Sequence, residues 1–324
     1  MDIPWNGFAS GKLMITGEYM VLCGAAALAV PLYAGQHMLV EPGSSNPYLQ
    51  WEAYDPSGLW LSVSYSLPGF GIVTSSDTAL ALKLQRMLKA LAELNPDFEI
   101  SASGQKVVTR LDFIREWGLG SSSSLTSLLA TFAGVGQMEL HRMISQGSGY
   151  DVACAVADGP LIYRIVNDRP EIRPVMFCPP FADKLWLVYL GKKQDSGAEV
   201  RRFLQLPKEG FLNETEEISR ISESLARVSD FEHFSALLNR HEEIMSKLLN
   251  AEAVQKRLFI DFKGVVKSLG AWGGDFVLAA GEGGRDEIVH YFGSKGLHTV
   301  IPFTEMVKTG FVAAAAGSPN STEI

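Results

Sequence analysis

One short segment constrains this chain more than any other, because it joins two glycines and four serines to the start of an apolar helix. It runs Trp117-Gly-Leu-Gly-Ser-Ser-Ser-Ser-Leu and continues with a helical apolar pattern to about residue 132. Glycines let the backbone approach a ligand closely, and a helix start presents unpaired N–H groups and the positive end of the helix dipole. The pattern therefore favours a bound anion, most simply a phosphate. A serine turn that only caps the helix is the alternative.

Other known phosphate and nucleophile motifs do not match this chain. A dinucleotide fingerprint would need glycine where Ser123 stands. A Walker A loop ending at Lys12 would need glycine at Asn6 and a hydroxyl residue at Leu13. No GxSxG nucleophile elbow surrounds the serines. The residues expected to hold phosphate, by position, are Gly118, Leu119, Gly120, Ser121, Ser122, Ser123 and Ser124.

Composition narrows the class of protein. The 324 residues exceed one ordinary domain, and 47% hydrophobic with 20% charged residues is typical of a globular protein with a core. The net charge of −8 and the shortness of the basic runs disfavour a nucleic-acid binder. The three cysteines lack CxxC spacing, and neither a signal peptide nor a bilayer-spanning stretch is recognisable. We expect a cytoplasmic protein with a small-molecule substrate, no nucleic-acid or membrane partner, and a homodimer left open.

Strand and helix patterns alternate without a regular βαβ rhythm, so the sequence predicts an α+β fold. The strands expected in the first part are 36–40, 47–54, 59–65 and two within 98–113. The helices expected are 76–94, 125–132, 150–157, 213–229, 231–249, 253–268 and 286–292. Further strands are expected within 160–190, at 276–280 and at 298–303. We expect an ATP-binding lobe over 1–180, a second lobe over 181–312 and a flexible tail over 313–324.

Three further segments could carry chemistry. Lys12 stands at the mouth of an apolar strand, where it could stabilise an oxyanion or keep a carboxylate ionised, or be an ordinary surface lysine. Asp151 opens an apolar helix, where it could act as a base or merely cap the helix. The run Gly270–Phe276 has three glycines in five residues, which is more than a helix C-cap needs and favours close approach to a ligand.

In this order, the segments SGKLMITGEYMVL, WGLGSSSSL and LGAWGGDFVLA resemble the three motifs of the GHMP family of small-molecule kinases, over residues 9–282. The family includes galactokinase, homoserine kinase, mevalonate kinase and phosphomevalonate kinase. The resemblance implies a two-lobed GHMP kinase fold. Its N-terminal lobe would be of the ribosomal-protein-S5-like type with a left-handed βαβ crossover, and its C-terminal lobe ferredoxin-like. It also implies ATP and Mg²⁺ as cofactors.

The resemblance assigns roles to individual residues. Asp151 matches the catalytic base, Lys12 matches the lysine beside that base, and Ser122 matches the serine that helps to hold Mg²⁺. The residues expected to contact the acceptor are Glu18, Tyr19, Gly149, Ser196, Gly273 and Gly274. Two positions depart from the family pattern. Glu139 is displaced from the position of a second metal ligand, and Trp272 replaces a glycine, where it could narrow the acceptor pocket or simply pack.

The motif variants favour particular acceptors. The sequences Gly-Glu-Tyr at 17–19 and Gly-Gly-Asp at 273–275 resemble phosphomevalonate kinase, and GSGYDVA at 147–153 resembles a bacterial subgroup with a GYDIA-like signature. These features favour mevalonate or phosphomevalonate, in isoprenoid precursor synthesis. A diphosphomevalonate decarboxylase-like enzyme is an alternative, although the GSGYD form resembles the kinases. A GHMP-fold sensor without turnover is another, and the retention of Lys12, Ser122 and Asp151 argues against it.

Overall fold

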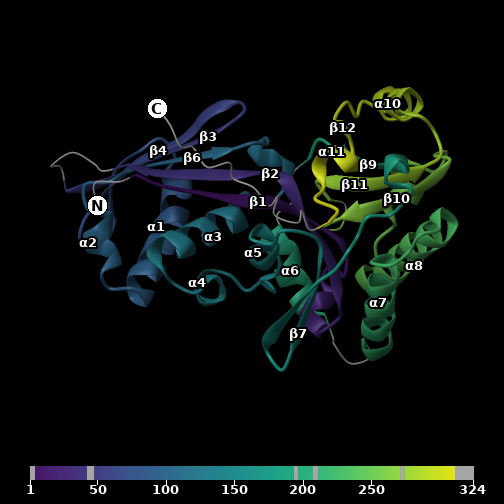
Figure 1. Ribbon diagram of the computed structural model, residues 1–324, viewed down its shortest axis with the longest axis horizontal. Coiled ribbons are helices and arrows are strands. Elements are labelled where there is room, and N and C mark those ends of the chain that lie inside the picture. The colour runs from purple at the N-terminus through teal and green to yellow at the C-terminus, as the bar shows by residue number, and fades with distance from the viewer. Residues whose placement is uncertain are drawn as a thin grey trace, which may run out of the picture.

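The computed structural model describes residues 4–41, 47–192, 196–206, 211–270, 272 and 274–310, with the Ser196 side chain left out. It contains two β-sheets with helices packed against them, which confirms the predicted α+β class (Figure 1). The strands of the first sheet are β1 (Trp5–Thr16), β2 (Ala27–Glu41), β3 (Tyr48–Asp55), β4 (Gly58–Ser66), β5 (Gly71–Ser75), β6 (Lys106–Leu111), β7 (Leu161–Val166) and β8 (Arg169–Pro174). Those of the second sheet are β9 (Leu185–Tyr189), β10 (Gly264–Leu269), β11 (Phe276–Gly281) and β12 (Val300–Pro302).

Short and long helices complete the fold. The α-helices are α1 (Thr78–Leu94), α2 (Phe98–Ala102), α3 (Ser121–Ala133), α4 (Gln137–Ile144), α5 (Tyr150–Ala155), α6 (Ser196–Leu204), α7 (Leu212–Leu225), α8 (Phe231–Leu249), α9 (Val254–Leu258), α10 (Arg285–Ser294) and α11 (Phe303–Met306). The 3-10 helices are η1 (Met20–Cys23), η2 (Arg115–Trp117) and η3 (Ala182–Lys184). Within the described residues, no helix is long and apolar enough to cross a bilayer.

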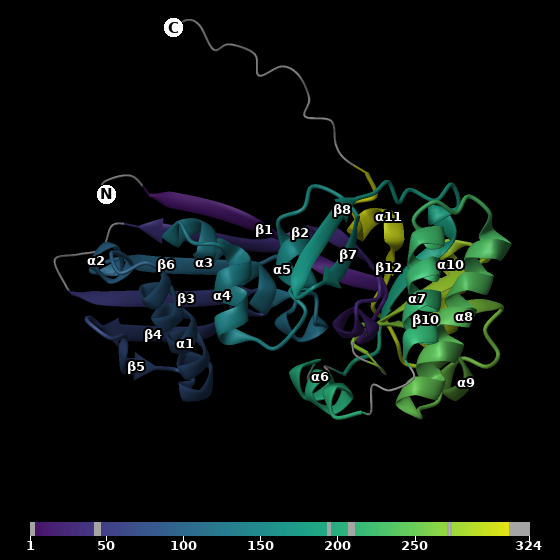
Figure 2. The same cartoon turned by 90° about the horizontal axis from the view of Figure 1, so that it is seen from below.

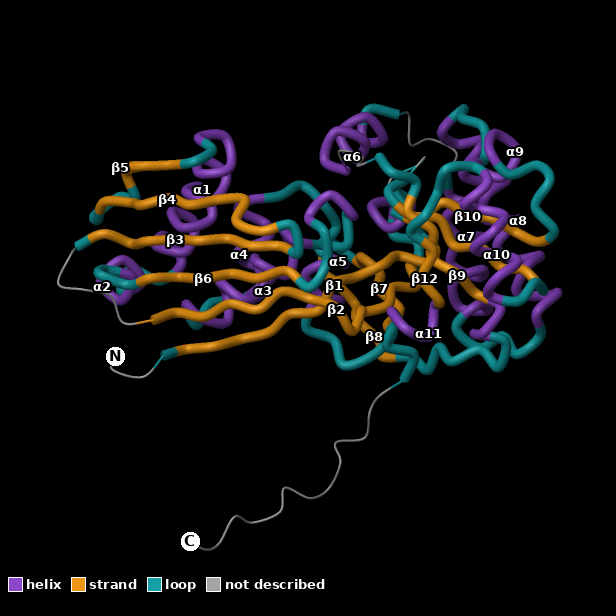
Figure 3. The backbone as a smooth tube through the Cα atoms, turned by 90° about the horizontal axis from the view of Figure 1, so that it is seen from above, coloured by secondary structure: helices purple, strands orange, loops and turns teal. Residues whose placement is uncertain are grey.

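The first sheet has the strand order β5-β4-β3-β6-β2-β7-β8, with β1 paired to β2 (Figure 3). Helices α1, α3, α4 and α5 lie on one of its faces (Figures 1 and 2). β3 and β6 pair in parallel, with α1 between them along the chain. The left-handed crossover stays a prediction, as does the lobe boundary at residue 180.

The second sheet, in the order β10-β11-β9-β12, shares one hydrophobic core with the first. A single cluster of buried side chains includes Ile15 of β1, Leu28 of β2, Leu187 of β9, Ile218 of α7 and Phe276 of β11. Helices α7 and α8 pack side by side, with α7 against β2 and α8 against β10 (Figure 1). The two sheets are therefore held together by apolar burial and not by a single linker.

Two secondary-structure predictions are wrong. The first strand expected within 98–113 is α2, in which Phe98 and Ala102 are buried one helical turn apart. The helix expected over 253–268 ends as α9 at Leu258, and β10 follows. There the Gln255 side chain receives a hydrogen bond from the Val266 N–H and donates one to the Gly264 carbonyl, which supports the turn between α9 and β10.

Four charged or titratable residues form a buried group between the sheets, which we call the interlobe charge cluster: Glu18, His241, Glu242 and Lys267. Lys267 Nζ lies 2.6 Å from Glu18 Oε1 and also donates to the Ser268 carbonyl. Lys267 is 0% exposed and Glu18 is 4% exposed. Because water does not solvate either charge, each charge is stabilised by the other. Burial acts to raise the pKa of Glu18, but the neighbouring Lys267 ammonium outweighs it, and the pKa is lowered.

His241 and Glu242 complete the cluster from α8. His241 Nε2 lies 3.2 Å from Glu18 but accepts the Gly17 N–H at 3.1 Å, and only an unprotonated Nε2 can accept. We take the ring as neutral, because burial and the nearby Lys267 lower the pKa of His241. Burial raises the pKa of Glu242 to about 7, although Lys267 Nζ lies 3.9 Å away. Glu18 is therefore the principal counter-ion of Lys267.

Substitution of Lys267 tests this cluster. Lys267→Met should lower the free energy of unfolding by about 3–5 kcal/mol, because Glu18 would be left buried without its cation. Lys295→Met, which removes the more exposed ion pair with Asp261, is the matched control and should cost about 0–1 kcal/mol. Urea unfolding of the two variants measures the difference. Equal losses would show that the buried pair has no special role.

Candidate functional site

The predicted phosphate loop spans the start of α3: Gly118, Leu119 and Gly120 precede the helix, and Ser121 to Ser124 form its first turn, so the helix begins four residues earlier than the expected 125–132. Gly120 is the N-cap residue with φ of 103°, and Gly118 has φ of 70° at the end of η2. Both angles lie in the left-handed region, which glycine adopts without strain. No strand runs directly into the loop, since β6 ends at Leu111 and η2 intervenes. As at any helix start, the N–H groups of the first residues have no partner within the helix and can receive an anion.

The four serines divide into two kinds. Ser123 and Ser124 are buried, and both hydroxyls donate within the fold, Ser123 to the Gly120 carbonyl and Ser124 to Gln36 Oε1 at 2.7 Å. Ser121 is half-buried and Ser122 is exposed. Hydroxyl contacts to a ligand are therefore expected from Ser121 and Ser122. Ser123 could contribute its backbone N–H, whereas the Ser124 N–H is bonded to the Gly120 carbonyl.

Lys12 is joined to this loop by the backbone. Its N–H donates to the Leu119 carbonyl at 2.8 Å, and Leu119 itself is buried. The pairing of β1 with β2 shifts register between Ser10 and Lys12, which marks an irregularity at this point of the strand. The Lys12 side chain then passes over Gly120, where an added Cβ would lie 3.1 Å from Lys12 Cγ. The surface-lysine alternative does not hold, because Lys12 is half-buried against the loop.

Lys12 also meets the segment that contains Asp151. Its ammonium lies 5.5 Å from the centroid of the Tyr150 ring, within reach of a cation–π contact. Burial acts to lower the pKa of Lys12, but Tyr150 and the charges of Asp151 and Asp275 outweigh it, and the net shift is upward. These neighbours thus favour the cationic form of Lys12. Asp151 lies in the first turn of α5, half-buried.

The alternative role of Asp151 as an N-cap is not observed. The N-cap of α5 is Gly149, with φ of 84°, and Asp151 Oδ1 accepts the N–H of Val152. This backbone angle favours glycine, and an added Cβ at Gly149 would lie 2.7 Å from the flexible end of the Met138 side chain. The preceding loop is fixed by Tyr163, which donates to the Ser148 carbonyl, and by His141 beside the Gly147 carbonyl.

The residues expected to contact an acceptor lie in different surroundings. Glu18 is in the interlobe charge cluster, with its carboxylate turned to Lys267 and not to open space. The Tyr19 hydroxyl accepts the Trp272 N–H at 2.8 Å, and burial raises the pKa of Tyr19 to about 12. Gly274 is buried next to Asp275. Gly273 and the side chain of Ser196 lie outside the described residues.

The acidic residue considered as a second metal ligand is exposed. Glu139 lies in the first turn of α4, with its carboxylate beside Gly136. Among the described residues, no group of three or more acidic, histidine or cysteine side chains could hold a metal ion. A divalent cation would therefore need ligands from a bound phosphate as well as from Ser122.

Two functional candidates were missed at the level of sequence. Tyr150 contacts Lys12, and its place directly before Asp151 was the available signal. Asp275 lies against Gly118 with 8% exposure, and its place directly after the glycine run could have indicated it. Neither contact can be read from local periodicity, because each joins distant segments.

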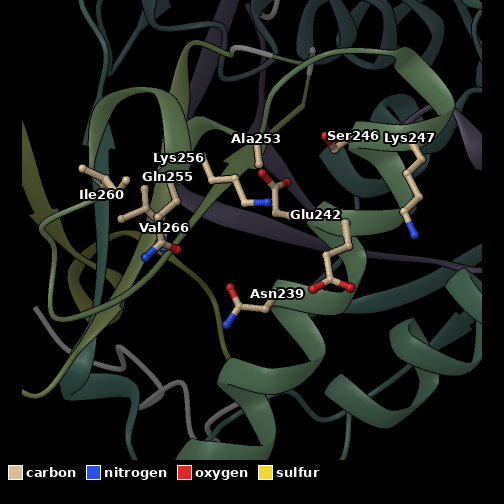
Figure 4. A pocket seen from close by; sticks show the side chains of 10 residues that line it. Asn239, Glu242, Ser246, Lys247, Ala253, Gln255, Lys256, Ile260 and Val266 are labelled. Carbon is tan, nitrogen blue, oxygen red and sulfur yellow. The ribbon is translucent and has the colours of Figure 1, made fainter.

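A pocket of about 540 Å³ lies elsewhere, between α8, α9 and β10 (Figure 4). Its lining residues are Asn239, Glu242, Glu243, Ser246, Lys247, Ala253, Gln255, Lys256, Ile260 and Val266. None of the predicted site residues is among them. It shares Glu242 with the interlobe charge cluster, and Gln255 and Val266 with the turn between α9 and β10.

Comparison with known proteins gives matches by structure only. No family model and no curated protein sequence matches the chain. Mevalonate kinase of Methanococcus jannaschii superposes with a TM-score of 0.68 at 15% identity, covering 96% of this chain and 99% of the other. The chain has the GHMP kinase fold.

Two further structures support this assignment of the fold. Streptococcus pneumoniae phosphomevalonate kinase, in complex with phosphomevalonate and AMPPNP, gives a TM-score of 0.65 at 18% identity and covers 91% of this chain and 97% of the other. Lactococcus lactis galactokinase in complex with galactose gives a TM-score of 0.62 at 14% identity and covers 95% of this chain and 94% of the other. At these identities the matches establish the GHMP kinase fold and nothing finer.

The division of the serines predicts two different phenotypes. Ser124→Ala should lower the free energy of unfolding by about 1–3 kcal/mol, because Gln36 Oε1 loses its buried donor. Ser122→Ala should change the free energy of unfolding by less than about 0.5 kcal/mol, yet weaken binding of Mg²⁺·ATP, the expected ligand, about tenfold. Thermal unfolding and calorimetry separate the two effects. Unchanged affinity in Ser122→Ala would remove this hydroxyl from the site.

Proposed function

We propose that this protein transfers the terminal phosphoryl group of ATP to a small anionic metabolite. The observation that carries the proposal is the convergence of three elements on one point. The start of α3 offers N–H groups to phosphates. The Lys12 backbone N–H is hydrogen-bonded to Leu119 of the loop, and the charge of Asp151 acts on the Lys12 ammonium. Phosphoryl transfer needs this kind of positioning and charge neutralisation more than covalent help.

Each residue has a role in the proposed reaction. Asp151 accepts the proton of the acceptor hydroxyl while the oxygen of that hydroxyl bonds to the terminal phosphorus of ATP. The bond from that phosphorus to the bridging oxygen breaks, and ADP leaves with the electron pair. Lys12 and the N–H groups of α3 stabilise the negative charge on the transferred group.

Magnesium fits the donors of the site. Mg²⁺ usually binds through one or two protein oxygens together with phosphate oxygens and water. The exposed hydroxyl of Ser122 at the helix start would provide such an oxygen, and the ion would neutralise phosphate charge. A protein cage of several carboxylates is not required.

The choice of acceptor class is supported by the charges of helix α6 beside Tyr19. Helix α6 packs Phe203 against Tyr19, with ring centroids 5.3 Å apart, and carries Arg201 and Arg202 in its last turn. Glu199 and Arg202 of this helix both act on the Tyr19 hydroxyl, with opposite effects on its pKa. The two arginines exceed the single glutamate of α6, and this excess of positive charge favours an anionic acceptor, for which we propose mevalonate or phosphomevalonate. A similar structure, L. major mevalonate kinase in complex with R-mevalonate, supports this choice, with a TM-score of 0.63 at 18% identity.

An ADP-release assay with a panel of acceptors tests the proposal. We expect ADP release with mevalonate or phosphomevalonate, and none with diphosphomevalonate, homoserine or sugars. Release of carbon dioxide and ADP from diphosphomevalonate would instead identify a decarboxylase. ATP binding without ADP release on the whole panel would contradict our choice of acceptor and favour a sensor.

Asp151→Asn is the decisive variant for the mechanism. Loss of the proton acceptor should lower kcat by about 10²–10⁴-fold, while AMPPNP affinity stays within about threefold. Asp158→Asn, on an exposed residue shortly after the same helix, is the matched control and should retain full activity. Full activity in Asp151→Asn would exclude Asp151 as the base.

A further inference from the structure

Asp275 stands unusually close to the phosphate loop. It lies between the glycine run and β11, and it is 8% exposed. An ideal Cβ on Gly118 would lie 1.9 Å from Asp275 Oδ2 and 2.4 Å from its Cγ. The carboxylate thus fills the space that any side chain at 118 would need, so the absence of a side chain at Gly118 is what allows Asp275 to reach the loop.

The second glycine of the loop is covered in the same manner. At Gly120, an added Cβ would lie 3.1 and 3.2 Å from Cγ and Cε of Lys12. Gly120 is therefore covered by the methylene stem of Lys12 from β1, and Gly118 by the carboxylate of Asp275 from the segment before β11. A loop that only capped a helix would not need both contacts.

The position of Asp275 is fixed by its neighbours. Its carbonyl accepts the Leu190 N–H at 2.9 Å, which anchors its backbone next to β9. The following residue, Phe276, packs edge-to-face on Trp117, with ring centroids 5.8 Å apart. Trp117 also lies 6.1 Å from the Tyr189 ring. Trp117, which precedes the loop, is thereby packed on the second sheet, and Asp275 lies where the loop meets that sheet.

We propose that Asp275 is a positioning residue, which orients the Lys12 ammonium and holds the loop at Gly118 in the shape that receives phosphate. The purpose of this arrangement rests on the proposed phosphoryl transfer. The contact of Asp275 with the loop and its effect on Lys12 do not depend on that function. Asp275 is not proposed to accept the proton of the acceptor, a role that stays with Asp151. It acts through Lys12 and through the loop backbone.

The charges around Lys12 agree with this role. The titratable groups that interact electrostatically with the Lys12 ammonium are Tyr150, Asp151 and Cys154 from α5 and Asp275 from the segment before β11. Burial acts to lower the pKa of Lys12, and Tyr150, Asp151 and Asp275 in that order raise it above the ordinary value. Asp275 is the smallest of these contributors and the one that does not belong to α5.

The test measures the reactivity of Lys12 directly. Acetic anhydride acetylates only unprotonated amines, and mass spectrometry reads each lysine separately. In Asp275→Asn the pKa of Lys12 should fall, so its acetylation at one alkaline pH should rise by about 3- to 10-fold relative to Lys295. Glu116→Gln, which removes an exposed charge two residues before Gly118, should leave this ratio unchanged. An unchanged ratio in Asp275→Asn, with the protein folded, would overturn the proposal.

Kinetics and a double-mutant cycle address the loop. Asp275→Asn should raise KM for ATP about tenfold, leave KM for the acceptor unchanged, and move the alkaline limb of the rate profile to lower pH, since Lys12 must stay protonated. Gly118→Ala should impair AMPPNP binding in the wild-type background more than in Asp275→Ala, where the space is free. If the effects of Gly118→Ala and Asp275→Ala on AMPPNP binding were additive, the contact between these two residues would have no role in binding. Wild-type protein that neither binds AMPPNP nor releases ADP would refute the proposed function, while Lys12 acetylation would still decide the role of Asp275.

Discussion

The buried ion pair between Lys267 and Glu18 is the constraint on which the rest of the site depends. The two residues are 249 positions apart in the chain and bond at 2.6 Å. Glu18 follows the strand that carries Lys12, and Lys267 lies in the strand that leads to Asp275. Because neither charge can be separated from the other without being left buried and unpaired, the ion pair fixes the segment SGKLMITGEYMVL relative to LGAWGGDFVLA. Nearby, the Tyr19 hydroxyl receives the Trp272 N–H and holds the third motif from the same side.

The phosphate loop lies between the two parts that this ion pair joins. Its backbone is bonded to β1 through Leu119, and its leading residue Trp117 packs on Phe276 of β11. Its glycines leave room for one charged side chain from each part. A site of this kind holds its charges before any ligand arrives, which is how preorganised sites stabilise developing charge. The shared hydrophobic core limits how far the two sheets can move independently of each other.

Local features of the sequence predicted much of this correctly. A helix after the glycines could be predicted because glycines, serines and an apolar repeat are adjacent in the chain, although it begins at Ser121 and not at residue 125. The position of Glu18 could not be predicted, because its partners Lys267 and His241 come from a distant strand and helix. The helix expected over 253–268 failed for a similar reason. Its second half is a strand because it pairs with β11 along its whole length, a contact that outweighs helical periodicity.

The central claim is that Lys12 lies at the terminal phosphate of ATP, and an acyl-phosphate derivative of ATP tests it most directly. Such a reagent transfers its acyl group to a lysine beside the terminal phosphate, and digestion with mass spectrometry identifies that lysine. Our account predicts acylation of Lys12, suppressed by excess ATP and lost in Lys12→Met. Labelling of Lys247 or Lys256 beside the α8–α9 pocket that ATP suppresses, with Lys12 unmodified, would contradict it.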